Sequence, residues 1–315
     1  MFAILLGMSA IIIAGLLWRI LLGAQKAENI RTYLVRAVYD IFLPALVLHV
    51  MWQTEISLNT IRLPLVSALA ILLSLLVASL IYANGKWLPG SSLQKRKAAG
   101  ALLLASSFGN FTYLGLPVLT QTFGPWAQSV AIHFDLFAST PLLFTVGILI
   151  ASHFGSSAKA TSSKKIHMGI ELIRVPALWA AIAGLFASSA QLPMPLWLDE
   201  ALGVLGAAVV PLMLLSIGMA LSWQQGWIQR IPFILPMVGI QLILMPLIVW
   251  GASIGVGMPA NFLAPAVIEG AMPTMVLGLV ICDRFKLDTS LYAEAVTVTT
   301  ALSLLTLPLW LKLVS

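Results

Sequence analysis

Apolar segments of about 20 residues recur from one end of the chain to the other. A membrane-spanning helix needs roughly 20 consecutive apolar residues, whereas a membrane β-strand is about half as long and alternates apolar with polar residues. These segments are long and do not alternate, so they predict an all-α integral membrane protein with ten transmembrane helices. The predicted spans cover residues 3–22, 33–53, 63–83, 98–123, 128–153, 173–190, 199–222, 232–254, 260–282 and 290–312.

Charged residues are too scarce to cover the surface of a soluble domain. Only 9% of the 315 residues are charged and 60% are hydrophobic, whereas an average soluble domain has about 25% charged residues. This composition excludes a cytosolic enzyme, a secreted disulfide-stabilised protein and a nucleic-acid-binding protein, since the net charge of +6 belongs to loops. The single cysteine, Cys282, excludes an internal disulfide and a metal site built from several cysteines.

Motifs typical of enzymes are missing from the sequence. There is no HExxH zinc motif, no P-loop and no GxSxG nucleophile elbow, and the four histidines are scattered. We therefore expect no enzyme activity, no catalytic residues, no resident metal and no cofactor. Without a P-loop, transport driven directly by nucleotide is excluded, which leaves gradients of the substrate or of a coupled ion as energy sources.

The basic residues predict how the chain crosses the membrane. Of the 17 Lys and Arg residues, 15 fall on one side of the predicted spans and only Arg62 and Lys312 fall on the other. Lys and Arg concentrate in cytoplasmic loops. The asymmetry therefore places both termini outside and all odd-numbered loops in the cytoplasm.

A Ser-rich hydrophilic linker at 155–166 divides the chain into two halves of five spans each, 1–154 and 167–315. Because each half has an odd number of spans, the second half enters the membrane from the opposite side. Such inverted repeats are typical of secondary transporters. The tripeptide Leu-Gly-Leu recurs at 114–116 and 277–279, at corresponding positions in the two halves.

The fourth span of each half contains helix-breaking residues near its middle. Pro lacks a backbone donor and clashes with the preceding turn, and exposed backbone groups survive in a membrane only where protein or a watery cavity supplies partners. Two breaks at corresponding positions therefore predict a binding site, although proline kinks without a ligand are the alternative. The candidate substrate-binding residues are Gly109, Asn110, Thr112, Tyr113 and Pro117 in span 4, with Met272, Pro273 and Thr274 in span 9.

Four ionisable residues, Asp40, His133, Asp135 and Glu269, lie well within the predicted spans and are candidates for ion or proton coupling, whereas His49 and Glu294 lie nearer the span ends. Glu269 precedes the second break, at the carbonyl end of a half-helix, where a carboxylate is disfavoured unless it is protonated or binds a cation. A structural hydrogen bond is the alternative for Glu269. Asp40 is four residues from Arg36, so a structural ion pair explains it equally well. His133 and Asp135 share no helical face, and each fits internal packing as well as function.

The two breaks resemble the auxin efflux carrier family, which includes plant auxin exporters and bacterial carriers of malonate or malate. Residues 110–117 match the family pattern N-x-x-x-x-G-x-P, and residues 271–273 with the loop 283–287 resemble its A-x-P segment and basic, aromatic turn. The resemblance implies a fold shared with bile-acid sodium symporters, in which spans 4 and 9 are broken and cross. It also implies a homodimer, a static scaffold of spans 1, 2, 6 and 7, and a moving transport domain that works as an elevator.

The resemblance implies a carrier of small organic anions, whose carboxylate would lie near Asn110 and the backbone around Pro273. Candidate substrates are mono- or dicarboxylates such as malonate or malate, or auxin-like acids, and the short central loop favours a bacterial inner-membrane carrier. A sodium- or proton-coupled symporter or antiporter of the bile-acid type is the alternative. Those sodium symporters place Gln four residues after Glu in span 9, but here Pro273 follows Glu269 at that spacing. A membrane enzyme or a receptor is a further alternative, although the chain lacks a clustered nucleophile and base, large loops and an output domain.

Overall fold

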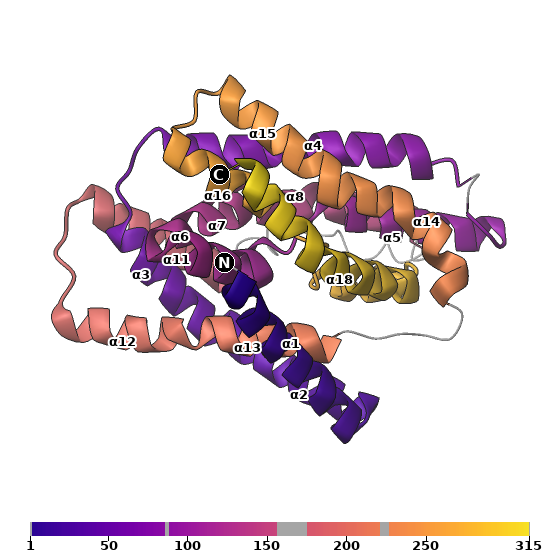
Figure 1. The fold of residues 1–315 in the computed structure, drawn as a ribbon, viewed down its shortest axis with the longest axis horizontal. Coiled ribbons are helices and arrows are strands. Elements are labelled where there is room, and N and C mark those ends of the chain that lie inside the picture. Colours follow the sequence, from indigo (N-terminus) through magenta and orange to yellow (C-terminus); the bar gives the residue numbers. More distant parts are fainter. Residues whose placement is uncertain (1, 86–87, 156–174, 221–226, 315) are drawn as a thin grey trace, which may run out of the picture. The chain divides into compact units, whose positions relative to one another are not determined.

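The computed structural model describes residues 2–85, 88–155, 175–220 and 227–314, and this part of the chain is almost entirely helical (Figure 1). The linker predicted at 155–166 lies outside the described residues, apart from Gly155. The α-helices and the shorter π- or 3₁₀-helices (η) are, in chain order, α1 (Phe2–Leu22), α2 (Ala24–Ala37), η1 (Val38–Phe42), α3 (Leu43–Gln53), α4 (Asn59–Tyr82), α5 (Ser92–Ser107), η2 (Phe111–Gly115), α6 (Leu116–Phe123), η3 (Pro125–Ala127), α7 (Gln128–Phe134), η4 (Asp135–Ser139), α8 (Thr140–Leu142), η5 (Leu143–Gly147), α9 (Ile148–Phe154), α11 (Pro176–Ser189), α12 (Leu196–Ala207), α13 (Val209–Ala220), α14 (Trp227–Gly239), η7 (Ile240–Leu244), α15 (Met245–Gly255), α16 (Ala260–Gly270), α17 (Gly278–Phe285) and α18 (Thr289–Val314).

Helical stretches in the described residues are long and apolar enough to cross a membrane. There are six of them: Ala24–Gln53, Asn59–Tyr82, Pro125–Phe154, Leu196–Ala220, Ile228–Gly255 and Thr289–Val314. Two shorter apolar helices, Gly7–Leu22 and Pro176–Ser189, coincide with predicted spans 1 and 6. Predicted spans 4 and 9 are each interrupted near the middle. An all-α, multi-pass membrane fold is therefore confirmed, while the count of ten spans stays a prediction.

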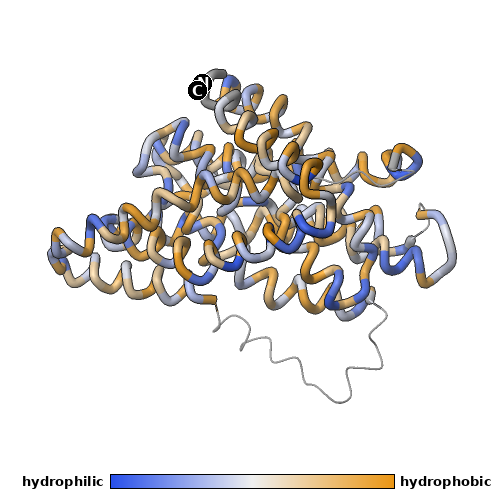
Figure 2. Tube along the Cα trace, turned by 90° about the horizontal axis from the view of Figure 1, so that it is seen from below, coloured by the Kyte–Doolittle hydropathy of each residue, from blue (hydrophilic) through white to orange (hydrophobic). Residues whose placement is uncertain are grey.

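Hydrophobic residues occupy most of the length of these helices (Figure 2). Many large apolar side chains point away from the protein interior, and Leu80 on α4 is an example at 74% exposed. Extended apolar surface of this kind is unfavourable in water and suits a lipid environment. The exposed side chains thus agree with the membrane assignment that the apolar runs predicted.

The chain divides into two compact units, and unit 1 comprises residues 1–64, 111–137 and 173–221. Within unit 1, α1 packs closely against α13. A Cβ atom at Gly218 would lie 1.9 Å from the carbonyl oxygen of Ile12, so only glycine allows the two backbones to approach this far. The Arg19 guanidinium also donates to the carbonyl of Met219 at 2.7 Å, at the end of α13. Helix α3 packs against α11 and α12 in the same unit.

Unit 2 comprises residues 65–110, 138–172 and 222–315. Its helix α5 is buried along its last three turns and packs against α9, α14 and α18. The hydroxyl of Tyr82, on α4, accepts a hydrogen bond from the Met237 N–H and donates one to the carbonyl of Phe233, both at 2.9 Å. In a regular helix the Met237 N–H would donate to the Phe233 carbonyl. The Tyr82 hydroxyl lies between these two groups and replaces that backbone hydrogen bond of α14.

Four prolines follow a π-helical turn, which widens the helix without ending it. A proline cannot donate to the carbonyl four residues earlier and its ring clashes there, and a π-helical turn relieves the clash. In unit 2 the carbonyl of Leu242, four residues before Pro246, accepts instead from Nε1 of Trp310 at 2.8 Å. The same arrangement of a π-helix two residues before a proline occurs at η1 and Pro44, η2 and Pro117, η4 and Pro141, and η7 and Pro246.

Candidate functional site

The first break interrupts predicted span 4 at residues 108–110. Helix α5 begins with a capping box between Ser91 and Gln94 and ends at Ser107, and the backbone of Phe108 is extended. Helical structure resumes at Phe111 and continues through Pro117, which lies inside α6. The disruption expected at Pro117 is therefore a π-helical turn, and the break itself lies at Phe108, Gly109 and Asn110.

The second break interrupts predicted span 9 at residues 271–277. Helix α16 ends at Gly270, where the N–H of Met272 donates to the carbonyl of Glu269 at 3.2 Å. Helical structure resumes with α17 at Gly278. Pro273 lies within the break and supplies no N–H, so it cannot extend α16.

The two breaks lie in unit 2 and pair with each other through backbone hydrogen bonds. Gly109 and Thr274 form an isolated antiparallel bridge. The N–H of Asn110 donates to the carbonyl of Pro273 at 2.7 Å, and the N–H of Met275 donates to the carbonyl of Phe108 at 2.9 Å. Backbone groups that the helices leave unpaired are thereby satisfied inside the protein, as a membrane interior requires.

Thr274 anchors the second break to two neighbouring helices. Its hydroxyl donates to the carbonyl of Ala105, in the last turn of α5, at 2.8 Å. Its N–H donates to the hydroxyl of Thr299, on α18, at 3.2 Å. Thr274 is fully buried, so these bonds replace solvent contacts that the residue cannot make. The hydroxyl of a second α18 residue, Tyr292, donates to the carbonyl of Met275 at 2.9 Å.

Gln241 holds the carbonyl of Met272, the residue before Pro273. Its Nε2 donates to that carbonyl at 2.9 Å from the π-helix η7, and its side chain is fully buried. Sequence reasoning missed Gln241, Tyr292 and Thr299 as residues of the break. The signal was present for Gln241, because it is the single amide in the apolar stretch 232–254. Intramembrane polar residues of this kind face the protein interior and mark functional positions.

Replacing Gln241 with Met keeps a side chain of similar length and removes the donor to the Met272 carbonyl. We expect Gln241→Met to lower the free energy of unfolding by about 1–3 kcal/mol, because a buried carbonyl loses its partner. Thermal unfolding in detergent measures the change. The matched control is Gln121→Met, at an exposed position in the last turns of α6, which should unfold like the wild type. Equal stability of the two variants would contradict the anchoring role of Gln241.

Asn110 presents a buried amide that the protein itself leaves unpaired. The residue is 4% exposed, and its Nδ2 has no hydrogen-bond partner among the described residues. Leaving a buried donor unsatisfied costs about 1–3 kcal/mol, so such groups in native proteins need an explanation. Donation to a bound acceptor, such as a carboxylate oxygen, would explain this amide.

Glu269 lies in the same unit, at the carbonyl end of α16, and is fully buried. The next residue, Gly270, packs against Val249 of α15, where an added Cβ would come within 2.6 Å of the valine Cγ2. Glu269 is thus held between closely packed helices, two residues before Met272. The position matches the sequence prediction, and the coupling role of this carboxylate stays a prediction.

The other predicted residues belong to unit 1. Thr112, in η2, donates a hydrogen bond from its hydroxyl to Oδ2 of Asp135, at the start of η4. This contact joins a predicted substrate-binding residue to a predicted coupling residue, which the sequence did not predict. Tyr113 follows in η2, and Pro117 is buried in α6.

His133 and Asp40 are also in unit 1 but differ in exposure. His133, on α7, is 2% exposed, and its Nδ1 lies 2.6 Å from the carbonyl oxygen of Ser129. Its Nε2 has no hydrogen-bond partner in the described part of the chain. The carboxylate of Asp40, in η1, is 47% exposed and forms an ion pair with Arg36 at 3.4 Å. The structural ion pair that the spacing suggested is therefore present.

The structure assigns the predicted site residues to two groups. Gly109, Asn110, Met272, Pro273, Thr274 and Glu269 belong to unit 2, whereas Thr112, Tyr113, Pro117, His133, Asp135 and Asp40 belong to unit 1. Among the described residues, no cluster of three or more His, Cys, Asp or Glu side chains could hold a metal ion. The chemistry at the breaks is instead that of backbone dipoles, the side-chain amides of Asn110 and Gln241, hydroxyl groups and the buried carboxylate of Glu269.

Comparison with known proteins agrees with a role in transport. The profile of the membrane transport protein family matches residues 11–311. An uncharacterized transporter from Methanothermobacter thermautotrophicus is 26% identical over 308 residues, covering 97% of this chain and 95% of that protein. An uncharacterized transporter from Methanocaldococcus jannaschii is 29% identical over 262 residues, covering 80% and 79%. The chain therefore belongs to the membrane transport protein family, the auxin efflux carrier family that its two motifs resemble, and it is a transporter rather than an enzyme.

Proposed function

We propose that this protein is a secondary transporter of small organic anions, such as malonate, malate or auxin-like acids. The observation that carries the proposal is the paired break in unit 2, where the side-chain amide of Asn110 is buried and has no hydrogen-bond partner among the described residues. Backbone amides and a neutral side-chain donor bind a carboxylate without placing a fixed charge in the membrane. The N-terminal end of α17 at Gly278, in the same unit, adds a favourable potential for an anion.

The division into two units supports alternating access of the elevator type. Besides residues 111–137 of predicted spans 4 and 5, unit 1 contains α1, α2, α3, α11, α12 and α13, which correspond to predicted spans 1, 2, 6 and 7. These spans are the ones that the family resemblance assigns to the static scaffold. In this proposal unit 2 carries the paired breaks and their ligand, the two halves are inverted repeats, and spans 4 and 9 cross at the breaks.

Proton coupling is the energy source that we favour over sodium. Glu269 is fully buried at the end of α16, and intramembrane carboxylates are typical of proton pathways in transporters. Asp135 and His133 are reserve candidates in unit 1, while Asp40 is the weakest because Arg36 already neutralises it. Coupling to an ion in the manner of the bile-acid symporters is the second candidate function, and the buried Glu269 is the observation that favours it.

The topology and assembly in this proposal follow from the sequence and the family. The 15 basic residues on one side support a topology with both termini outside, which in a bacterial inner membrane is the periplasm. The lipid bilayer and an organic anion are the expected partners, and the functional form is a homodimer.

Counterflow in proteoliposomes tests the proposal directly. Vesicles loaded with unlabelled malonate should accumulate labelled malonate, and a panel of malate, monocarboxylates and auxin-like acids should rank the substrates. The same assay with and without sodium, and at two pH values, separates proton coupling, sodium coupling and uniport. Counterflow of cations but of none of these anions would reject the proposal, as would formation of a chemical product without transport.

A further inference from the structure

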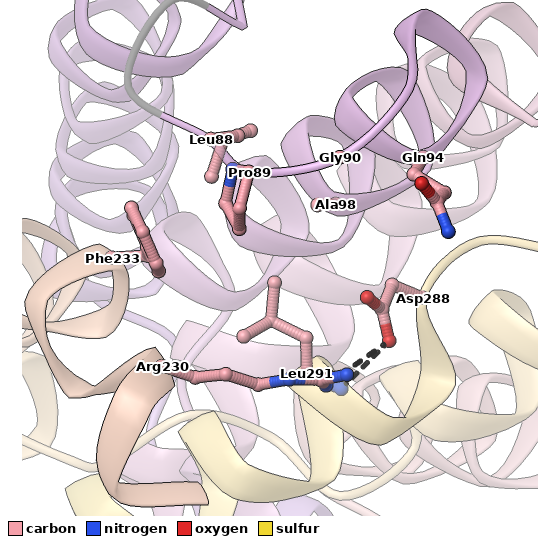
Figure 3. Close-up of a pocket in the computed structure, with 9 residues that line it drawn as sticks. All are labelled: Leu88, Pro89, Gly90, Gln94, Ala98, Arg230, Phe233, Asp288 and Leu291. Atoms are coloured by element: carbon pink, nitrogen blue, oxygen red, sulfur yellow. Dashed lines mark hydrogen bonds and ion pairs between the residues drawn. The ribbon is translucent and has the colours of Figure 1, made fainter. Parts of the chain in front are cut away.

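A pocket in unit 2 lies away from the paired breaks, between the 88–98 segment and the first turns of α14 and α18 (Figure 3). Its volume is about 220 Å³, and Arg230 and Asp288 contribute its charged groups. A cavity of about 10–15 Å³ is enough for one water molecule, so this pocket has room for several. The surrounding loops are those that the basic residues assign to the cytoplasmic side.

Arg230 connects this pocket to a buried carboxylate. Its guanidinium Nη1 lies 3.6 Å from Oδ1 of Asp288 and 3.6 Å from Oε1 of Glu294. The same nitrogen donates to the hydroxyl of Ser290 at 3.2 Å, and that hydroxyl donates to Oε1 of Glu294 at 3.4 Å. The side chains of Arg230 and Asp288 are 39% and 29% exposed, whereas that of Glu294 is only 3% exposed. A chain of polar groups therefore leads from solvent to Glu294.

The charges in this cluster do not balance when both carboxylates are ionised. One guanidinium faces two carboxylates, which leaves a net charge of −1 next to buried apolar surface. Oε2 of Glu294 has no hydrogen-bond partner among the described residues. A buried carboxylate oxygen without a partner is costly, and one added proton removes both the excess charge and most of this cost.

Other elements that pack against α18 carry ionisable residues as well. These elements are α5, α14, α16, α17 and η7. Arg230 of α14 and Asp288, in the turn before α18, are the charged groups that act directly on Glu294. The remaining ionisable residues on these elements are Lys95, Arg96 and Lys97 on α5, Glu269 on α16, and Cys282, Asp283 and Arg284 on α17.

Helix α18 links Glu294 to the second break. Tyr292, two residues before Glu294, donates its hydroxyl to the carbonyl of Met275, and Thr299 accepts from the N–H of Thr274. Tyr292 and Thr299, which make these two contacts, lie on the same helix as Glu294. A change in the charge of Glu294 alters its attraction to Arg230 and therefore acts on this helix. The geometry thus provides a physical route from the pocket to the break.

We propose that Glu294 is a proton-binding residue, which takes up a proton from cytoplasmic water in this pocket. Oε2 receives the proton and the carboxylate becomes a neutral acid, which frees Arg230 to pair with Asp288 alone. Linkage of this proton to the transport cycle rests on the proposed function, whereas proton binding itself does not. Glu294 is then a second acidic coupling residue of unit 2, in addition to Glu269.

Infrared difference spectroscopy of the full-length protein in lipid tests proton binding without any substrate. Acidification of the wild type should produce a carbonyl band of a protonated carboxylic acid, and Glu294→Gln should lose one component of it. Above about pH 6 an exposed carboxylate stays ionised, so over the range from pH 8 to about pH 6 the matched control Glu200→Gln, at an exposed position on α12, should keep every component. Retention of every component in Glu294→Gln would overturn the proposal.

A second variant keeps the proposal testable if Glu294→Gln does not fold. In Arg230→Gln, the missing positive charge should make Glu294 bind its proton at a higher pH, so that the band appears at more alkaline pH. An unchanged midpoint would mean that the cluster is only structural. In proteoliposomes, Glu294→Gln should flatten the pH dependence of malonate counterflow. A wild type that transports no anion but shows the band refutes the proposed substrate class and leaves the proton site intact.

Discussion

Replacing Asn110 with Ala should reduce malonate counterflow by about 10- to 100-fold. A hydrogen bond to a charged group contributes about 1.5–3 kcal/mol, and 1.4 kcal/mol corresponds to a tenfold change in affinity. The Asn110 amide is buried and has no partner in the described part of the protein, so its loss removes a ligand contact without breaking an internal one. The backbone bond from Asn110 to Pro273 does not depend on the side chain and should persist.

The control for this prediction is a second Asn to Ala change in the same unit. Asn261 lies in the first turn of α16 and is exposed, so Asn261→Ala should transport like the wild type. Asn110→Asp should be at least as inactive as Asn110→Ala, because it replaces the donor with a carboxylate that repels an anion. Counterflow in Asn110→Ala equal to that of Asn261→Ala would remove Asn110 from the binding site.

Replacing Gly218 with Ala should destabilise unit 1 by about 1–3 kcal/mol, the typical cost of overpacking a tight contact. The added Cβ would lie 1.9 Å from the carbonyl oxygen of Ile12, which belongs to the backbone of α1 and cannot rotate away. Helices α1 and α13 would have to separate, which also strains the bond from Arg19 to the carbonyl of Met219. Thermal unfolding in detergent, with monodispersity as a second readout, measures the effect.

Gly251, on α15, is the matched control because nothing lies within 4 Å of a Cβ added there. An Ala in the interior of a helix is more favourable than Gly by about 0.5–1 kcal/mol, so Gly251→Ala should be neutral or slightly stabilising. If Gly218→Ala unfolded at the same temperature as Gly251→Ala, the close approach of α1 to α13 would not contribute to stability.

Local sequence was sufficient for the membrane fold and for the position of the breaks. An apolar run indicates that a helix lies in lipid, and Gly109 and Pro273 indicate where helical hydrogen bonding ends. Both signals depend only on residues that are neighbours in the sequence. The exception is Pro117, where the expected disruption is absorbed by the π-helix η2. Backbone chemistry alone does not distinguish a break from a widened turn, because the packing of the surrounding helices determines which one forms.

Contacts between distant residues were beyond the sequence. Thr274 and Ala105 are 169 residues apart, and no local pattern indicates that their hydroxyl and carbonyl meet. The same is true of Gln241 and Met272, and of Arg230 with Glu294. In the sequence, Glu294 lies near the end of a predicted span and is not a candidate coupling residue. Its burial beside the partly exposed Arg230, which only the structure shows, is the basis of its proposed role.

The sequence by itself determined that this chain is a membrane protein, which helices are interrupted and which family it belongs to, because hydrophobicity, proline and short motifs act locally. Only the tertiary structure decided that Asn110 pairs its backbone with Pro273 and leaves its amide free of internal partners among the described residues. It also decided that Asp40 is neutralised at the surface while Glu269 is fully buried. The physical reason is that the energy of a polar group in a membrane depends on its neighbours in space, which packing sets.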